Sequence, residues 1–353
     1  MPERHHSALH FKRHDGVPRR LHQHPPSKRF HGCGQSTLSK VLITGASGLL
    51  GGTLTLEARN RGWEVVAVYN THAFHADGVT SVQADLADGG ASERLVRRHR
   101  PDWIVHCAAL TNVDWCEGHP DEAHRVNADV PRVLSRLACE VGARIVYIST
   151  DAVFDGATGD YSEEDAPAPV NVYATAKLAG ETAVLEAHPA AAVVRTNIYG
   201  WNMQEKLSLA ERILSRLEAG QTVPGFTDVF FSPMLADDLA DVLLDLMDRR
   251  LSGTYHVVAS EKCSKYDFAV RVAEVFGLDP SLVQPTPIDT VALSAQRPRD
   301  ASLATGKMQK SLGRRMPDVR SGLLRFRAAR DSGHAEKIKS CRGDEIDVQS
   351  ANR

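Results

Sequence analysis

From residue 40 onward the chain alternates short apolar, β-branched runs with segments in which apolar positions recur every three or four residues. The first pattern is typical of buried strands and the second of helices that pack on one face. The expected strands span residues 40–44, 64–68, 81–83, 103–107, 144–149 and 191–195. The expected helices span residues 49–60, 120–141 and 172–187. This alternation predicts βαβ units and therefore an α/β fold with a doubly wound parallel sheet.

The two ends of the chain and its last third differ from this pattern. Residues 1–38 are rich in His, Arg, Pro and Ser without apolar periodicity, and residues 326–353 are charged and aperiodic. We expect a disordered leader and a disordered tail there. Residues 39–200 then form the expected sheet domain, and residues 201–325 form a smaller substrate lobe at the ligand edge of the sheet. A further strand expected at 254–258 allows strands of the two parts to interleave.

Composition and charge narrow the class of protein. The net charge of −2 gives no reason to expect nucleic acid or an anionic membrane as a partner. No run approaches the roughly 20 apolar residues that span a bilayer, and the N-terminus lacks the apolar core of a signal peptide. The six cysteines show no Cys-x-x-Cys spacing, which fits reduced thiols. We therefore expect a cytoplasmic protein without a metal site, and a homodimer is compatible with the sequence.

The first expected strand runs directly into a glycine-rich turn and then a helix. The turn reads Gly45-Ala-Ser-Gly48-Leu-Leu-Gly51. Backbone N–H groups at such a helix N-terminus bind the pyrophosphate of a dinucleotide. We expect Gly45 to allow the tight turn, Gly48 to allow close approach of phosphate, and Gly51 to let the helix pack on the strand. The spacing predicts a nucleotide site and resembles that of extended short-chain dehydrogenase/reductases.

The loops after the second and third strands bear on the choice of cofactor. An acidic residue after the second strand commonly binds the ribose hydroxyls of NAD. Residues 68–72 here read VYNTH, with neither an acidic residue nor an arginine. The missing carboxylate slightly favours NADP(H) over NAD(H). Asp85, after the third strand, is either the partner of the adenine amino group or a cap for the turn before Ala87, and the sequence does not separate these roles.

Tyr173 and Lys177 are four residues apart in an expected helix, so both lie on one face, one turn apart. A phenol has an unperturbed pKa of about 10, and an adjacent ammonium lowers this pKa because it favours the phenolate. Such a pair can protonate an oxygen that gains charge as hydride reaches its carbon. Alone, the pair fits an exposed aromatic beside a solvated lysine. Thr150, at the carboxyl edge of the same sheet, favours catalysis because its hydroxyl can bind the same substrate oxygen.

Longer motifs resemble the dTDP-4-dehydrorhamnose reductase family. They are residues 108–117 (AALTNVDWCE), 149–156 (STDAVFDG), 161–164 (YSEE), 169–181 (PVNVYATAKLAGE) and 297–303 (RPRDASL). The similarity runs in order from about residue 40 to residue 313 and so covers most of the chain. It implies a Rossmann-type NAD(P)-binding fold and the NAD(P)H-dependent reduction of a 4-keto group on a nucleotide-linked deoxysugar.

The same resemblance implies roles for individual residues. The catalytic residues would be Thr150, Tyr173 and Lys177, with Asn127 as a supporting amide. The cofactor residues would come from the glycine turn, from the loops after the third and fourth strands and from the catalytic helix: Gly45, Ser47, Gly48, Leu49, Leu50, Gly51, Asp85, Leu86, Ala108, Ala109, Tyr173 and Lys177. The substrate residues would be Thr111, Val113, Asp151 and Arg297.

The chain departs from that family where the sugar would bind. It has Ala152 where the family commonly has Tyr, and Ala174 in place of Gly. Residues 195–200 read RTNIYG without the usual Trp, and residues 230–233 read FFSP in place of a Gly-Ser-Pro-Thr type of segment. These differences leave the identity of the sugar open, but not the chemistry.

Two other functions stay open. Residues 105–109 (VHCAA) are similar to the regulatory β subunit of methionine adenosyltransferase, which binds NADP and acts as a partner subunit. A nucleotide-sugar epimerase or dehydratase would use the same three catalytic residues with tightly held NAD. The presence of all three residues favours an enzyme over a regulatory subunit, and the segment that begins Arg297-Pro298 favours the reductase.

Overall fold

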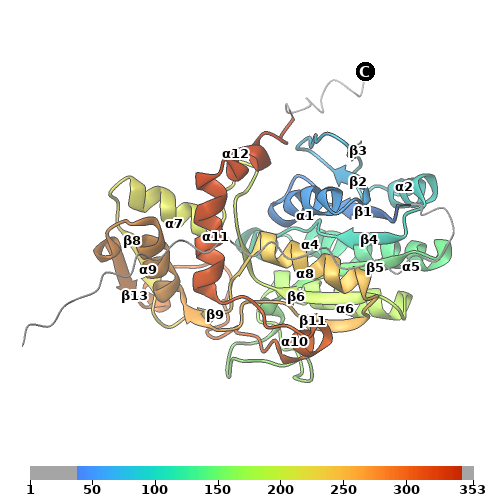
Figure 1. Cartoon of the computed structure of the whole chain (residues 1–353). Coiled ribbons are helices and arrows are strands. Elements are labelled where there is room, and N and C mark those ends of the chain that lie inside the picture. Colours follow the sequence, from blue (N-terminus) through green and yellow to red (C-terminus); the bar gives the residue numbers. More distant parts are fainter. Residues whose placement is uncertain (1–37, 344–353) are drawn as a thin grey trace, which may run out of the picture. The chain divides into compact units, whose positions relative to one another are not determined.

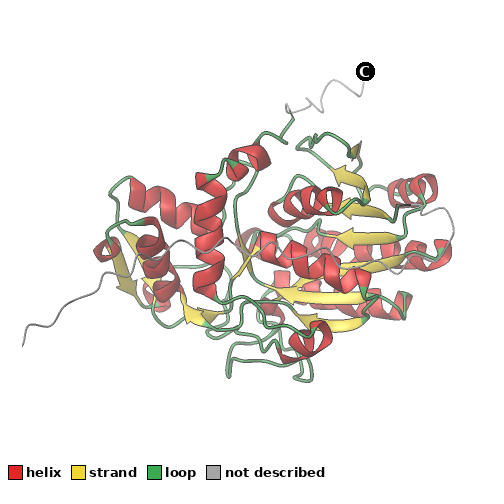
Figure 2. Ribbon diagram, in the orientation of Figure 1, coloured by secondary structure: helices red, strands yellow, loops and turns green. Residues whose placement is uncertain are grey.

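The computed structural model describes residues 38–343, so most of the expected leader and the last part of the expected tail lie outside the described residues. Seven strands form the central sheet: β1 (Lys40–Thr44), β2 (Glu64–Tyr69), β3 (Thr80–Gln83), β4 (Trp103–His106), β5 (Arg144–Thr150), β6 (Ala192–Thr196) and β11 (Gly253–His256). Their order is β11-β6-β5-β4-β1-β2-β3, and every neighbouring pair is parallel. The predicted doubly wound parallel sheet is confirmed (Figure 2).

Helices cover both faces of this sheet. One face carries α2 (Ala91–His99), α5 (Val130–Val141) and α6 (Val172–Ala187). The other carries α1 (Leu49–Asn60), α8 (Ala236–Asp248) and α10 (Gly306–Leu312). Leu134 and Val184 belong to the core on the first face, and Leu54 and Leu243 belong to the core on the second. Strands buried on both faces explain the continuous apolar runs in the sequence.

The helix expected at residues 120–141 is interrupted in the structure. It consists of α4 (Pro120–His124), one π-helical turn (Arg125–Asp129) and α5, and it follows the short α3 (Val113–Gly118). Single π-helical turns inside α-helices are often found at functional sites. This turn contains Asn127, which is described with the active site below.

A smaller lobe lies beside the sheet (Figure 1). Its elements are α7 (Leu209–Glu218), β8 (Val223–Phe226), β9 (Phe230–Phe231), β12 (Cys263–Ser264), α9 (Lys265–Phe276), β13 (Val283–Thr286), α11 (Val319–Asp331) and α12 (His334–Lys339). The short strands β7 (Ile198–Tyr199) and β10 (Met234–Leu235) pair with each other. Residues 201–325 do not all belong to the lobe, because β11 pairs with β6 in the main sheet and α8 packs against α1.

The main difference from the expected fold concerns residues 326–343, which were expected to be part of a disordered tail. Helix α11 runs through residue 326, and α12 follows it. Phe326 is fully buried, and its ring stacks on that of Trp201 at 4.1 Å between centroids. The prediction of disorder is therefore wrong for residues 326–343. The segment looks charged because arginines alternate with the apolar positions, but Leu323 and Phe326, about one turn apart, are both buried in the lobe core.

Within residues 38–343, no helix combines the length and the apolar composition that crossing a membrane requires.

Candidate active site

A cavity of about 1030 Å³ opens at the carboxyl ends of the sheet strands. Parallel sheets bind ligands at this edge, where the strand order reverses between β1 and β4. The glycine turn after β1 lines the cavity, as do the loops after β2, β3 and β4, the end of β5 and the start of α6. Every cofactor, substrate and catalytic residue expected from the sequence lines this cavity except Asn127.

The three glycines of the turn have different reasons to be glycine. Gly45 has a φ of +66°, and a Cβ there would lie 2.8 Å from Ala108 N. A Cβ on Gly51 would lie 2.1 Å from the Gly45 carbonyl oxygen, so its close contact is with the turn itself and not with the strand as expected. Gly48 has an extended backbone (φ −89°, ψ 172°) that any residue can adopt. The space over Gly48 belongs to the cavity, which fits a pyrophosphate at the N-terminus of α1.

Gly48→Val should therefore weaken the binding of a nicotinamide dinucleotide, NADPH or NADH, by at least about tenfold, or about 1.4 kcal/mol, while the protein keeps its fold. The new side chain meets only the Gly45 carbonyl oxygen, at 3.2 Å for its Cβ, and otherwise enters the space for phosphate. Fluorescence titration measures the affinity. Gly89→Val is the matched control, because a Cβ at Gly89 has no atom within 4 Å. Equal affinities in the two variants would place the phosphate elsewhere.

The part of the cavity wall that follows β2 carries no acidic residue directly after the strand. Asn70, Thr71 and His72 line this part, and Asp85 lines it from the loop after β3. Asp85 Oδ1 accepts a hydrogen bond from Ala87 N at 3.0 Å. This capping bond is one of the two alternative roles expected for Asp85 from the sequence. The carboxylate is exposed and has a second oxygen, so this bond leaves an acceptor for a ligand.

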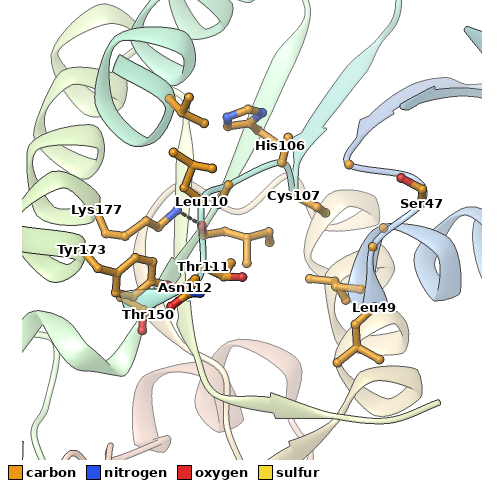
Figure 3. Close-up of a pocket in the computed structure, with 18 of the residues that line it drawn as sticks. Ser47, Leu49, His106, Cys107, Leu110, Thr111, Asn112, Thr150, Tyr173 and Lys177 are labelled. Carbon is orange, nitrogen blue, oxygen red and sulfur yellow. Dashed lines mark hydrogen bonds between the residues drawn. The ribbon is translucent and has the colours of Figure 1, made fainter. Parts of the chain in front are cut away.

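Tyr173 and Lys177 face the cavity from α6, beside Thr150 at the end of β5 (Figure 3). The start of α6 is fixed by Asn171, whose side chain accepts from Ala174 N at 2.9 Å. Lys177 Nζ donates to the carbonyl oxygen of Ile148 at 2.7 Å. Ser47 and Leu49 of the glycine turn lie across the cavity from these residues. Tyr173 and the glycine turn thus occupy opposite walls of the cavity.

Burial is the largest influence on the pKa values of Tyr173 and Lys177. It raises the pKa of Tyr173 to about 12, although a hydrogen bond with Thr150 acts in the opposite direction. Burial also lowers the pKa of Lys177 to about 7, against the attraction of Glu181. The Tyr173 pKa is therefore raised and not lowered as expected from the adjacent lysine, because desolvation is the largest effect on this phenol. Tyr173 holds its proton at neutral pH, as a proton donor must.

Neighbouring titratable groups in the cavity do not compete for this role. Burial lowers the pKa of His106 to about 3 and raises the pKa of Cys107 to about 12. Both side chains are therefore neutral near pH 7. His106 Nδ1 is also engaged with Thr44 Oγ1 at 2.7 Å. An imidazole with so low a pKa is a weak base, and a thiol that keeps its proton is a poor nucleophile.

Asn127 supports the site from behind the cavity wall. Its side-chain oxygen accepts from Leu110 N at 3.0 Å, and its amide nitrogen donates to Leu110 O at 3.0 Å. Both bonds fix the loop after β4 that lines the cavity. The Asn127 carbonyl oxygen accepts from Tyr147 Oη at 2.7 Å. Gly180 of α6 passes so close that a Cβ would lie 2.2 Å from the same carbonyl oxygen.

Gly180 was not among the residues expected from the sequence, although a glycine inside a helix is itself a signal of close packing. Gly180→Ala should lower the free energy of unfolding by about 1–3 kcal/mol, because the added methyl overpacks the contact of α6 with Asn127. Turnover should fall too, since Lys177 lies on the same helix. Denaturant unfolding measures the first effect. Gly306→Ala, in helix α10 with open space around it, should not destabilise the protein, and equal effects would contradict the packing role.

The expected substrate residues all line the cavity, but they differ in the hydrogen bonds that they make within the chain. Arg297 donates to Asp114 Oδ2 at 2.8 Å and to Ala295 O at 3.0 Å, so its guanidinium is bound within the chain. Thr111 Oγ1 accepts from Lys206 Nζ at 3.3 Å. Val113 opens α3 at the cavity wall. The remaining substrate residue, Asp151, accepts from Asn197, which the sequence did not indicate.

The fold and this site define the class of the protein. A doubly wound parallel sheet, a glycine cradle at the N-terminus of α1 and a Thr-Tyr-Lys group on the facing wall are those of an NAD(P)-dependent oxidoreductase of the short-chain dehydrogenase/reductase type.

Comparison with known proteins gives the family. Residues 39–331 match the RmlD substrate binding domain, and the chain belongs to this family. The dTDP-4-dehydrorhamnose reductase of Mycobacterium tuberculosis is 39% identical over 74% of this chain and 82% of that protein. The methionine adenosyltransferase 2 subunit beta of Pongo abelii is 35% identical over 79% of this chain and 84% of that protein. Both resemblances predicted from the motifs are confirmed.

A solved structure agrees with the fold. The crystal structure of dTDP-4-dehydrorhamnose reductase from Bacillus anthracis, in complex with NADP, matches this chain with a TM-score of 0.74 and 30% identity. The match covers 83% of this chain and 99% of that one.

Proposed function

We propose that this protein uses NAD(P)H to reduce the 4-keto group of a nucleotide-linked deoxysugar to an alcohol. The observation that carries the proposal is the position of Thr150, Tyr173 and Lys177 on the wall opposite the glycine turn of a single large cavity. The cavity volume of about 1030 Å³ is at the upper end of the usual range for ligand sites, as two large ligands require. Relatives named dTDP-4-dehydrorhamnose reductase supply the substrate class.

The residues of the chain account for the proton chemistry. When bound at Gly45, Gly48 and Gly51, NAD(P)H supplies the hydride for the carbonyl carbon. Thr150, whose hydroxyl donates to Asp151 Oδ1 at 3.2 Å, turns its proton to the carbonyl oxygen and polarises it. Tyr173 then donates its proton to the alkoxide, which is a far stronger base than the phenolate left behind. Lys177 in its charged form binds the ribose and stabilises that phenolate.

We further propose that the cofactor is NADPH in preference to NADH. No acidic residue follows β2 in the cavity wall, so the carboxylate that commonly binds the ribose hydroxyls of NAD is missing. The side chains available there belong to Asn70, Thr71 and His72, none of which repels a 2′-phosphate as a carboxylate would. Titration with both cofactors tests this preference, and tighter binding of NADH would overturn it.

The affinity for NADPH should depend on pH through Lys177. Burial lowers the pKa of this side chain to about 7, so the free enzyme carries the ammonium below that pH and loses it above. If the charged form binds the ribose, the dissociation constant should rise by up to about tenfold per pH unit above 7. Titrations between pH 6 and pH 9 measure the slope. Lys177→Met should bind more weakly with a flat profile, and a flat profile in the wild type would contradict this role.

A second candidate function is that of an NADP-binding regulatory subunit. It is favoured by the 35% identity to methionine adenosyltransferase 2 subunit beta, a protein named as a subunit. Turnover separates the two functions. Purified protein should oxidise NADPH when a panel of nucleotide-linked 4-keto sugars is added, and at least one sugar should be reduced. Tight NADPH binding without reduction of any sugar would favour the regulatory subunit.

A further inference from the structure

Lys265 carries an amino group at the cavity that the reaction described above does not use. It is the first residue of α9, whose start is fixed by a capping box between Ser264 and Asp267. Its side chain lines the cavity and is partly buried, with Nζ 3.5 Å from the centroid of the Phe231 ring. In the described part of the chain, Nζ has no hydrogen bond or ion pair. The aromatic contact holds the cation but leaves its N–H donors for a ligand.

Asp151 supplies an acceptor at the same cavity from the end of strand β5. It follows Thr150 directly and is only 4% exposed. Its Oδ2 accepts from Asn197 Nδ2 at 2.7 Å, and its Oδ1 accepts from Thr150 Oγ1 at 3.2 Å. A carboxylate offers about four acceptor positions, so these two bonds leave room for others. Asn197 also lines the cavity and orients the carboxylate.

Lys265 and Asp151 attract each other without a direct ion pair. Burial raises the pKa of Asp151 and lowers the pKa of Lys265 to about 8, so both charges are poorly hydrated. A ligand group that bonds to both would supply hydrogen bonds that burial denies them. Because α9 belongs to the lobe and Asp151 follows β5 of the sheet, such a ligand would join the two parts.

The chemistry of the pair selects the ligand group. A hydroxyl accepts from the ammonium and donates to the carboxylate at the same time. A phosphate at neutral pH offers mainly acceptors and is repelled by Asp151, and an apolar group satisfies neither partner. Because Thr150 binds the reacting carbonyl oxygen and Asp151 is its neighbour, the hydroxyl belongs to a ring carbon next to the carbonyl. In a 4-keto-6-deoxyhexose, C5 carries the methyl group, and C3 carries the hydroxyl.

We propose that Lys265 and Asp151, the latter held by Asn197, bind the 3-hydroxyl of the sugar and so determine which 4-keto sugars are reduced. This rests on the proposed function, because it names the part of the substrate that the same site recognises. It predicts that the free enzyme discriminates between two nucleotide-linked 4-keto-6-deoxy sugars that differ only in the presence of the 3-hydroxyl.

The test compares kcat/KM for this pair of sugars. Wild type should prefer the 3-hydroxy sugar by at least about tenfold. Lys265→Met should lose most of this preference, because kcat/KM falls for the 3-hydroxy sugar and stays the same for the sugar without the 3-hydroxyl. Lys265→Arg, which keeps a cation with N–H donors, should retain part of the preference. Lys262→Met is the matched control, because Lys262 does not line the cavity and pairs with Asp160 and Asp300.

Equal loss with both sugars in Lys265→Met would overturn the inference. Calorimetric binding of the two corresponding sugar alcohols gives the same comparison without turnover. If no sugar is reduced, the proposed reaction is wrong, but the binding of the two sugar alcohols still tests the proposed site for the 3-hydroxyl. A preference for the 3-hydroxy alcohol that Lys265→Met abolishes would support the subsite, and equal binding of both alcohols by wild type would overturn it.

Discussion

Tyr173→Phe should lower kcat for the sugar reduction by about 10²–10⁴-fold, because it removes the phenolic proton that the proposed mechanism passes to the alkoxide. The ring stays, so the packing of α6 and the affinity for NADPH should barely change. Burial raises the pKa of Tyr173 to about 12, which keeps the proton in place at neutral pH in wild type. Steady-state kinetics and a fluorescence titration on the same preparation separate the two quantities.

Tyr266→Phe is the control for this variant. Tyr266 lies one residue into α9, is partly buried and does not line the cavity. Its replacement should leave kcat close to that of wild type. Retention of the wild-type rate by Tyr173→Phe would show that another group donates the proton, even if the fold and the cofactor site are as described.

Phe326→Ala should lower the free energy of unfolding by about 3–5 kcal/mol, the usual cost of removing a large aromatic side chain from a core. Phe326 is fully buried, its ring stacks on Trp201, and its carbonyl oxygen accepts from Trp201 Nε1 at 2.9 Å. Denaturant unfolding of the full chain measures the loss. The effect should be on stability, because Phe326 does not line the cavity.

Leu324→Ala on the same helix is the matched control. Leu324 is 49% exposed, so its truncation should change the free energy of unfolding by no more than about 0.5 kcal/mol. A small effect of Phe326→Ala, similar to that of Leu324→Ala, would mean that α11 does not pack on the lobe core as described.

Most of the sheet could be predicted from the sequence because strands such as β1, β2 and β4 are continuous apolar runs that are buried on both faces. The helices 49–60 and 172–187 have the observed bounds, the first preceded by Gly48 and the second by the cap Asn171. Helix α11 could not be predicted in the same way, because its buried face is narrow. Arg325 and Arg330 on its outer side form ion pairs with other parts of the chain, which local periodicity does not reveal.

In the candidate site, too, the residues related by local sequence could be predicted, and those brought together by the fold could not. Tyr173 and Lys177 were predictable because a helix fixes their relation, and the glycine turn was predictable because it follows a strand. Asn197 binds Asp151, and Lys265 comes to line the same cavity, only after the chain has folded, and nothing in the local sequence marks either residue. The pKa of Tyr173 depends on burial, which a spacing of four residues does not determine.

Transfer of deuterium to the sugar from NADPH that carries ²H at both C4 positions is the most direct test of the reaction proposed for this cavity. The labelled cofactor and a nucleotide-linked 4-keto-6-deoxy sugar are incubated with the full chain, and the product is analysed by NMR and mass spectrometry. We expect one deuterium at C4 of the sugar for each NADPH oxidised by wild type, and almost none with Tyr173→Phe. An unlabelled, unreduced sugar in the presence of wild type that binds NADPH tightly would contradict the proposed function.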